Sequence, residues 1–162
     1  RIARNPLARA LRIDKLTLCA LAAVAAAWED RDAAEESVPV ASMLAVDPGV
    51  LAQRAARLAR LIRLELDTVC ADTASVDISV VDDPSEAGGG SLPTVSIPGV
   101  SVCIKARGVS CDELQRRLRM GDPPVVARVA DGSVRLHLRT IFDRDFGRLA
   151  AATASAIASA HA

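Results

Sequence analysis

The sequence predicts an α+β domain in which a small, mainly antiparallel sheet of three or four strands packs on helices, after a long N-terminal helix. The periodic segments follow the order helix, helix, strand, loop, strand, helix, hairpin and helix. Strands that are separated by helices but include a hairpin are typical of this class. The 162 residues include one Trp, two Phe and no Tyr, so the core has to consist of Ala, Val, Leu and Ile.

The first predicted helix covers residues 6–29. Asn5 is a favourable N-cap, Pro6 suits the first helical position, and alanine is frequent in the second half of the segment. The charged segment 31–37 is expected to end this helix, and 38–46 is expected to be a short helix or turn.

The second long helix begins at Pro48 and is capped by Asp47. Its apolar positions recur at helical spacing and share one face: Leu51, Ala55, Leu58, Ala59, Ile62, Leu66 and Val69. Four arginines, at 54, 57, 60 and 63, lie mostly on the other side. They are read either as a tRNA contact or as a solvated face, and the solvated face is favoured because charge rows on helices usually face water.

Two strands are predicted at 76–81 and 100–105, with an irregular connection over 82–98. The alternation of apolar and polar residues supports the first strand. Ser110 is then expected to cap a helix over 111–119.

A hairpin is predicted around the Asp-Gly dipeptide at 131–132, which favours a two-residue type I′ turn. The turn sets the register, and three apolar pairs then share one side of the ribbon: Val129 with Val134, Ala127 with Leu136, and Val125 with Leu138. On the other side Arg128 lies opposite Arg135, followed by His137 and Arg139. Opposed arginines repel each other, so this pattern predicts a negative group nearby.

A last, alanine-rich helix is expected after Asp143. The predicted organisation is therefore a linking helix over 1–37, an α+β domain over 38–149 and an alanine-rich C-terminal helix or tail over 150–162. Because the chain begins at Arg1 without a methionine, we expect it to be part of a longer protein.

The composition excludes several classes of function. Twenty basic and twenty acidic residues cancel, which argues against a protein that mainly wraps nucleic acid. The four cysteines (Cys19, Cys70, Cys103 and Cys111) form no C-x-x-C pair, so we predict buried, reduced thiols and no metal site. The apolar run 17–27 has about half the length of a membrane span, so we predict a cytoplasmic protein without a membrane segment.

Three segments carry a resemblance to a known family. They are RNPLARALRIDKLTL at 4–18, GGGSLP at 88–93 with Pro98 following, and DPPVVARV at 122–129 with DG at 131–132 and LRT at 138–140. Each segment by itself is common, but their order and spacing are specific. Together they make the chain similar to the bacterial selenocysteine synthases, the L-seryl-tRNA(Sec) selenium transferases, from residue 4 to about residue 149.

The resemblance implies the small C-terminal domain of a fold-type I enzyme that uses pyridoxal 5′-phosphate (PLP). Such an enzyme converts L-seryl-tRNA(Sec) to L-selenocysteinyl-tRNA(Sec) with selenophosphate. In the family the lysine that binds PLP lies in a Gly-Asp-Lys context before the Asn-Pro-Leu motif, and neither Lys15 nor Lys105 has that context. The chain is therefore expected to hold no catalytic residue and to be inactive alone. The family also implies assembly as a ring of dimers, a decamer.

The resemblance marks Arg9 and Arg12 as part of the pocket for the selenium-donor anion. Three positions apart on a helix, they would project from one face, and guanidinium groups suit a tetrahedral oxyanion. The alternative interpretation is two surface arginines on an amphipathic helix.

Arg139 is the third predicted substrate-binding residue. The substrate is an ester to tRNA, so Arg139 is expected to meet either the ester carbonyl or a tRNA phosphate, and the alternative is an ion pair with an acidic side chain. The family usually has an aspartate at the position of His137 and an apolar residue at that of Arg135.

Two other functions remain open at the level of the sequence. One is a related PLP-dependent lyase of small amino or sugar acids, which shares the fold. The other is a non-catalytic assembly module that uses the arginine-rich helix and the alanine-rich tail. The run Gly88–Gly90 could be mistaken for a phosphate-binding loop, but no lysine and no helix start follow it. It is therefore interpreted as a loop that needs unusual backbone angles.

Overall fold

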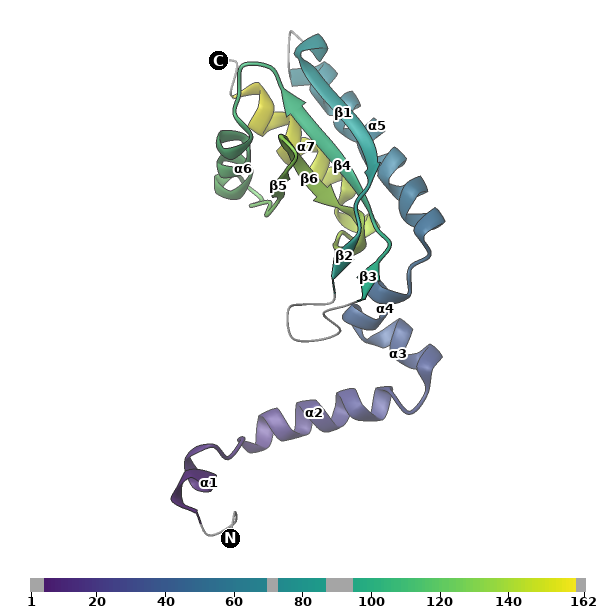
Figure 1. Ribbon diagram of the computed structural model, residues 1–162, viewed down its shortest axis with the longest axis vertical. Coiled ribbons are helices and arrows are strands. Elements are labelled where there is room, and N and C mark those ends of the chain that lie inside the picture. Colours follow the sequence, from purple (N-terminus) through teal and green to yellow (C-terminus); the bar gives the residue numbers. More distant parts are fainter. Residues whose placement is uncertain (1–4, 70–72, 87–94, 160–162) are drawn as a thin grey trace. The chain divides into compact units, whose positions relative to one another are not determined.

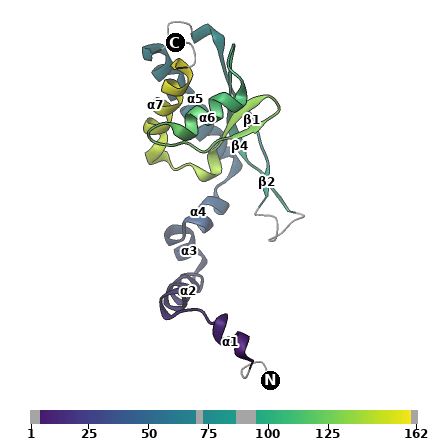
Figure 2. The same cartoon turned by 90° about the vertical axis from the view of Figure 1, so that its left-hand side faces the viewer.

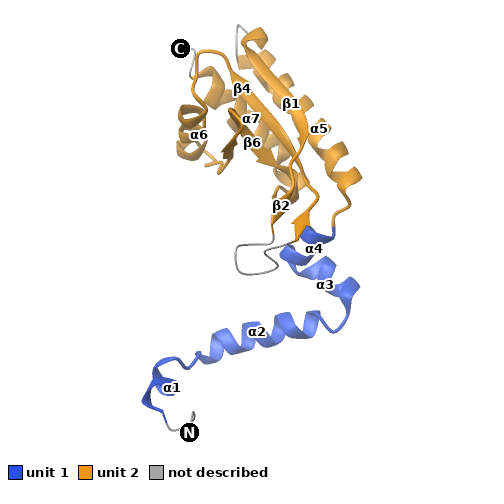
Figure 3. Cartoon of the chain, in the orientation of Figure 1, with its two compact units in different colours: residues 1–45 blue, residues 46–162 orange. Residues whose placement is uncertain are grey.

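A computed structural model describes residues 5–69, 73–86 and 95–159 of the chain. It divides into two units, residues 1–45 and residues 46–162 (Figure 3). The boundary lies just before the second long helix predicted from the sequence.

The described part of unit 1 consists of helices: α1 (Pro6–Ala10), α2 (Lys15–Ala27), α3 (Arg31–Ser37) and α4 (Pro39–Ala45) (Figure 1). The predicted single helix over 6–29 is wrong, because the chain leaves the helix at Leu11 and resumes it only at Lys15. The segment expected to end that helix forms a helix of its own, α3. Of the two possibilities predicted for residues 38–46, a short helix or a turn, the structure forms the helix, α4.

The break before α2 is explained by Asp14, which caps the new helix. Its Oδ1 accepts the backbone N–H groups of Leu16 at 2.8 Å and Thr17 at 3.0 Å. The hydroxyl of Thr17 donates to Oδ2 at 2.6 Å, and this bond is the main reason that the pKa of Asp14 is lowered. A side chain that satisfies the free N–H groups of a first helical turn favours a helix start at that point.

Unit 2 is an α+β domain, as predicted. Its helices are α5 (Pro48–Val69), α6 (Cys111–Met120) and α7 (Phe146–Ala158), with 3₁₀ turns η2 (Thr73–Ser75), η3 (Leu138–Thr140) and η4 (Asp143–Asp145). Its strands are β1 (Val76–Asp82), β2 (Ser85–Glu86), β3 (Ser96–Ile97), β4 (Val100–Ala106), β5 (Arg128–Ala130) and β6 (Ser133–His137). The main sheet is antiparallel in the order β1-β4-β6-β5, and β2 pairs with β3 in a separate ribbon.

The predicted helix start at Pro48 is confirmed, since Oδ1 of Asp47 accepts the N–H of Gly49 at 2.7 Å. The predicted face is buried in α5, except for Val69, which is 51% exposed. The arginine row is not simply solvated. Arg54 and Arg57 bind Asp143 at 2.6 Å and 3.0 Å, so these two side chains tie α5 to the segment before α7.

Arg63, in the same row, donates from Nη2 to the carbonyl oxygen of Ile78 in β1. The strand β1 is at the edge of the sheet, so this contact ties α5 to an edge strand. Sequence periodicity alone could not show these contacts, because their acceptors are distant along the chain.

The hairpin prediction is confirmed at its turn and in part along its strands. Asp131 and Gly132 have φ values of 48° and 64°, as a type I′ turn requires. Val129 pairs with Val134, and Arg128 lies opposite Arg135. The pairing ends there, because β5 has only three residues, so the two outer apolar pairs of the prediction are not formed as a ladder.

The helices of unit 2, α5, α6 and α7, lie on one side of the main sheet. Helix α5 packs against β1, β4 and α7, and α6 packs against α7, β5 and β6 (Figures 1 and 2). Alternate residues of β4, namely Val100, Val102 and Ile104, are buried in the core formed between these layers. The intervening residues Ser101 and Cys103 therefore belong to the opposite face of the sheet.

The segment from residue 150 onward, expected as a C-terminal helix or tail, begins within α7 (Phe146–Ala158). Ala150, Ala154 and Ile157 are buried in the core of unit 2. Among the described residues, no helix combines the length and the apolar character needed to cross a bilayer.

Candidate functional site

Arg9 and Arg12 do not share a helix face. Arg9 lies in the last turn of α1, whereas Arg12 lies in the connection between α1 and α2. The prediction of two arginines three positions apart on one helix is therefore wrong, because the cap at Asp14 starts a separate helix. Both residues are exposed, and no carboxylate in the described part of the chain pairs with either of them.

Arg139 lies in unit 2, in the 3₁₀ turn η3 that follows β6. The residue is only 6% exposed. Its Nη1 donates to the carbonyl oxygen of Val46 at 3.3 Å, and its Nη2 donates to that of Pro98. Burial lowers the pKa of Arg139. The guanidinium group thus joins the chain before α5 to the chain before β4.

A buried carboxylate, Asp83, binds the two arginines that oppose each other across the hairpin. The Asp83 side chain is 4% exposed. Its Oδ1 accepts from Nη1 of Arg135 at 2.9 Å and from Nη2 of Arg128, and its Oδ2 accepts from the hydroxyl of Ser101 at 2.6 Å. The negative group predicted near these arginines is confirmed, and it belongs to the chain itself. We call Asp83, Ser101, Arg128 and Arg135 the Asp83 cluster.

The contacts of the cluster set the charge of Asp83. Burial by itself raises the pKa of this carboxyl, but hydrogen bonds from Ser101, Arg128 and Arg135 and the charge of Arg128 together hold it below its ordinary value. Arg135 is only 13% exposed, and its second terminal nitrogen also reaches Asp131 in the turn. Asp83 and Arg135, the least exposed charges of the cluster, therefore each have a partner of opposite sign, as buried charges require.

His137 joins the Asp83 cluster to Arg139. Its Nε2 lies 2.9 Å from the backbone oxygen of Asp83, and its Nδ1 accepts the N–H of Arg139 at 3.4 Å. Because Nδ1 accepts, this arrangement assigns the proton of the neutral ring to Nε2, which donates to Asp83. The segment carrying Arg139 is thereby held to the end of β1.

Gly99 makes room for this histidine. A Cβ atom at position 99 would lie 2.5 Å from Nε2 of His137 and 2.6 Å from the backbone oxygen of Asp83. The carbonyl oxygen of Gly99 accepts the N–H of Asp83 at 2.8 Å. Glycine is thus required here by close approach of neighbouring atoms.

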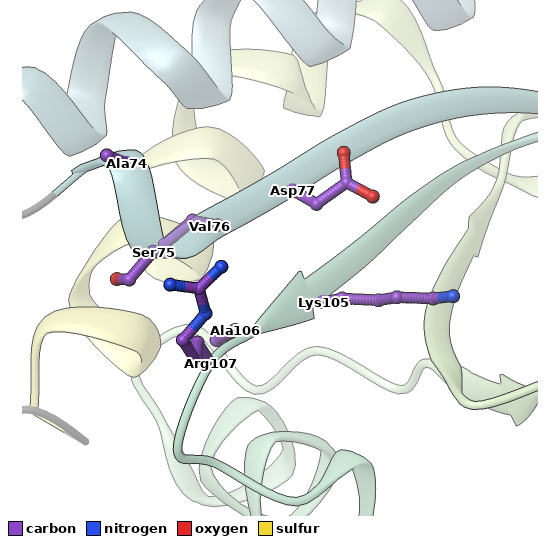
Figure 4. A pocket seen from close by; sticks show the side chains of 7 residues that line it. All are labelled: Ala74, Ser75, Val76, Asp77, Lys105, Ala106 and Arg107. Atoms are coloured by element: carbon purple, nitrogen blue, oxygen red, sulfur yellow. The ribbon is translucent and has the colours of Figure 1, made fainter.

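An open pocket of about 370 Å³ lies where β1 begins and β4 ends (Figure 4). Its lining residues are Ala74, Ser75, Val76, Asp77, Lys105, Ala106 and Arg107. Asp77 and Lys105 are partners across the two strands, and the N–H of Arg107 donates to the carbonyl oxygen of Ser75 at 2.9 Å. The pocket contains none of the three predicted substrate-binding residues.

The cysteines and the glycine loop have mixed outcomes. Cys103 is buried, as predicted, Cys111 is half-buried, and Cys19 is exposed on α2. Cys70 and the loop Gly88–Gly90 lie outside the described residues. In the described ranges, no three His, Cys, Asp or Glu side chains are grouped so that they could hold a metal ion.

The sequence reasoning missed the role of Asp83 and Ser101. Alternation along β4 places Ser101 on the face opposite Val100 and Val102, which is a readable signal for a polar group on that face. Asp83 directly follows β1, in an Asp-Asp-Pro sequence. Only the fold shows which of the two aspartates turns inward.

The comparisons with known proteins agree on one family. Residues 1–142 match the family model described as SelA, L-seryl-tRNA selenium transferase. Three relatives are named L-seryl-tRNA(Sec) selenium transferase. The protein of Aquifex aeolicus is 39% identical over 145 residues, which are 90% of this chain and 30% of the relative. The protein of Nitratidesulfovibrio vulgaris is 40% identical over 157 residues (97% and 32%), and that of Desulfomicrobium baculatum 39% over 158 residues (98% and 33%).

These matches cover most of this chain but a minor part of each relative. Nine-tenths or more of this chain is covered, but the chain spans only about a third of the length of the curated relatives. The match also includes α1 and α2 of unit 1 as well as most of unit 2. The chain therefore belongs to the L-seryl-tRNA selenium transferase family and corresponds to part of the length of its members.

Proposed function

We propose that the chain is the C-terminal part of a PLP-dependent enzyme that converts L-seryl-tRNA(Sec) to L-selenocysteinyl-tRNA(Sec) with selenophosphate. The observation that carries the proposal is the family match over residues 1–142. Identities of 39–40% over nearly the whole chain, to relatives named for this reaction, support it. The share of the relatives' length that remains outside the match supports a larger parent enzyme.

The two lysines of this chain do not suit a covalent PLP site. Lys15 is the exposed first residue of α2, and Lys105 is an exposed residue of β4 beside the open pocket. A lysine that attacks a carbonyl group is normally activated by desolvation or by a neighbouring cation. We therefore place the PLP lysine in sequence outside this chain, and we infer that the chain alone is inactive. We also infer that the parent is cytoplasmic and assembles as a ring of dimers.

Arg9 and Arg12 are proposed to bind the selenium-donor anion. Their guanidinium groups are solvent-exposed, and the ion pairs of the described residues do not involve them. An arginine without a carboxylate partner is available to a phosphate-like group, which accepts two parallel N–H bonds. Arg12 lies in a connection rather than in a helix. This position is compatible with anion binding, because binding depends on where the guanidinium group lies and not on the secondary structure that carries it.

Replacing Arg9 or Arg12 by alanine in the complete parent enzyme is expected to raise the apparent Kd for selenophosphate about tenfold in each case, which corresponds to about 1.4 kcal/mol. The physical reason is the loss of one charge-assisted contact to the anion. Titration of selenophosphate against initial rate measures the effect.

Arg31→Ala provides a matched control for these two variants. Arg31 is an exposed arginine of the same unit, and it is paired with Glu35 at 3.0 Å. Its loss is expected to leave donor affinity unchanged. If both Arg9→Ala and Arg12→Ala behave like this control, the proposed anion site is refuted.

Arg139 is proposed to contact the ester or a phosphate of the tRNA substrate through a guanidinium group that the backbone holds in place. Arg139→Lys keeps the charge but loses the planar fork. A substrate contact predicts a rise of about tenfold in KM for seryl-tRNA(Sec), measured well below the melting temperature. If Arg139 only anchors Val46 and Pro98, the melting temperature falls and KM stays at its original value.

A further inference from the structure

Helix α2 has an apolar surface on nearly every side. Leu16, Leu18, Leu21 and Val24 and the following Trp28 are 84%, 55%, 58%, 44% and 53% exposed. At about 100° per residue, these five side chains spread over roughly 200° of the helix circumference. Most of the remaining positions are alanine, and no charged residue occurs between Lys15 and Glu29.

The preceding residues, in α1 and in the connection to α2, also expose large apolar side chains. Leu7, Leu11 and Ile13 are 64%, 78% and 48% exposed, and neither α1 nor α2 contains a buried residue. We call residues 5–28 the apolar arm. Large exposed apolar surfaces of this kind usually mark sites where another protein element binds.

The distribution of these residues indicates how the arm is covered. An amphipathic surface helix carries one apolar stripe, whereas a helix that is apolar all round is buried inside a larger structure. A second copy of α2 packed alongside would cover only one side of it. The frequent alanines allow close approach of neighbouring elements on the remaining sides.

The comparisons indicate where such cover could come from. The family match begins at residue 1, so the apolar arm lies within the matched region. About two thirds of the length of the relatives lies outside the match. That sequence is large enough to surround a helix of 13 residues.

We propose that the apolar arm is an internal core element of the complete enzyme, buried by the part of the parent polypeptide that corresponds to the relatives' sequence outside the match. The inference rests on the proposed function, because it assumes a parent of the relatives' length. It goes further in assigning the arm, which also carries Arg9 and Arg12, to the interior of that parent. Docking of the arm would then hold the donor-binding arginines in position.

Hydrogen exchange measured by mass spectrometry tests this proposal on two intact proteins, this chain and the full-length relative of Aquifex aeolicus. After correction for sequence, the α2 amides are expected to exchange nearly unprotected in this chain. The aligned segment of the relative is expected to be protected about a hundredfold more strongly, as in core elements. Equal, weak protection in the two proteins would overturn the proposal.

A second measurement separates the alternative occupant, a second copy of this chain. Analytical ultracentrifugation compares the sedimentation of the original chain with that of the double variant Leu18→Glu/Leu21→Glu. The control is Val126→Glu, which changes an apolar side chain of unit 2 that is 82% exposed. Protection of α2 in a dimer that only the double variant dissociates would show self-association and refute the proposal. Sedimentation as a monomer, with the aligned segment protected only in the relative, supports it.

These outcomes are independent of the donor-binding test. Exchange of the α2 amides reports burial of the arm and does not depend on selenophosphate. Unchanged donor affinity after Arg9→Ala and Arg12→Ala, together with a protected segment in the relative, would refute the anion site alone. The opposite pair of results would refute only the burial of the arm.

Discussion

Replacing Asp83 by asparagine is expected to destabilise unit 2 by about 3–5 kcal/mol, because the change leaves the largely buried Arg135 with only the exposed carboxylate of Asp131 as a counter-charge. Arg135 is 13% exposed and donates to Asp83 at 2.9 Å, and Arg128 lies directly opposite it on the hairpin. The amide can still accept a hydrogen bond, but it cannot offset the repulsion between two guanidinium groups. Urea unfolding of the 162-residue chain, followed by circular dichroism, measures the loss.

Asp82→Asn is the matched control for this change. Asp82 is the preceding residue and is exposed, so its replacement is expected to change the free energy of unfolding by no more than about 0.5 kcal/mol. Equal unfolding midpoints for the two variants would show that the Asp83 cluster does not stabilise the fold.

The contribution of Asp83 should also depend on pH. Its pKa is lower in the folded protein than the ordinary value near 3.9, so the stabilisation is complete above about pH 4 and is lost as the pH falls through the folded pKa. The difference in stability between the original chain and Asp83→Asn should therefore shrink below about pH 4. Glu113, whose pKa is lowered to about 2 by hydrogen bonds from Arg116 and Arg117, affects both proteins alike. A difference that stays constant down to about pH 2 would contradict the assignment.

Gly99→Ala is expected to destabilise unit 2 by about 1–3 kcal/mol, the usual cost of forcing extra atoms into a packed site. The new Cβ atom would lie 2.5 Å from Nε2 of His137 and 2.6 Å from the backbone oxygen of Asp83. The histidine ring and the backbone at the end of β1 both have to shift to make room. Backbone moves at a higher cost than a flexible side chain, so the change destabilises the fold. Thermal unfolding and the NMR shifts of His137 report the two effects.

Gly147→Ala supplies the control, since a Cβ atom at this α7 position meets nothing within 4 Å. It should be neutral or stabilising by up to about 1 kcal/mol, because alanine favours a helix over glycine. The double variant Gly99→Ala/His137→Ala should recover about 0.5 kcal/mol or more relative to the sum of the single changes, because the ring contact is removed. A Gly99→Ala protein as stable as Gly147→Ala would show that position 99 tolerates a side chain.

These two predictions bear on the proposed site through Arg139. His137 accepts the N–H of Arg139, and Arg139 donates to the carbonyl oxygen of Pro98, next to Gly99. Disturbing Asp83 or Gly99 is therefore expected to displace the guanidinium group without changing any residue proposed to bind substrate.

The sequence by itself determined the elements whose causes are local. Helix α5 follows from a cap at Asp47 and apolar residues at helical spacing, and Ser110 caps α6 by accepting the N–H of Glu113 at 3.2 Å. The Asp131-Gly132 turn follows from the positive φ angles that these residues tolerate. The register of a two-residue turn places Arg128 opposite Arg135. Because two opposed arginines repel each other, the sequence also predicted a negative charge nearby.

Only the tertiary structure decided which distant groups meet. Asp83 binds Arg135, 52 residues away, and Arg139 binds the backbone at Val46, 93 residues away. Periodicity and turn chemistry report interactions within a few residues, so they cannot identify such partners. The break between α1 and α2 was local in principle, but the cap at Asp14 competed with a continuous helical pattern, and sequence reasoning chose the pattern. Periodicity thus gave the elements of this fold, and long-range packing decided which charged side chains are buried in it and which remain exposed.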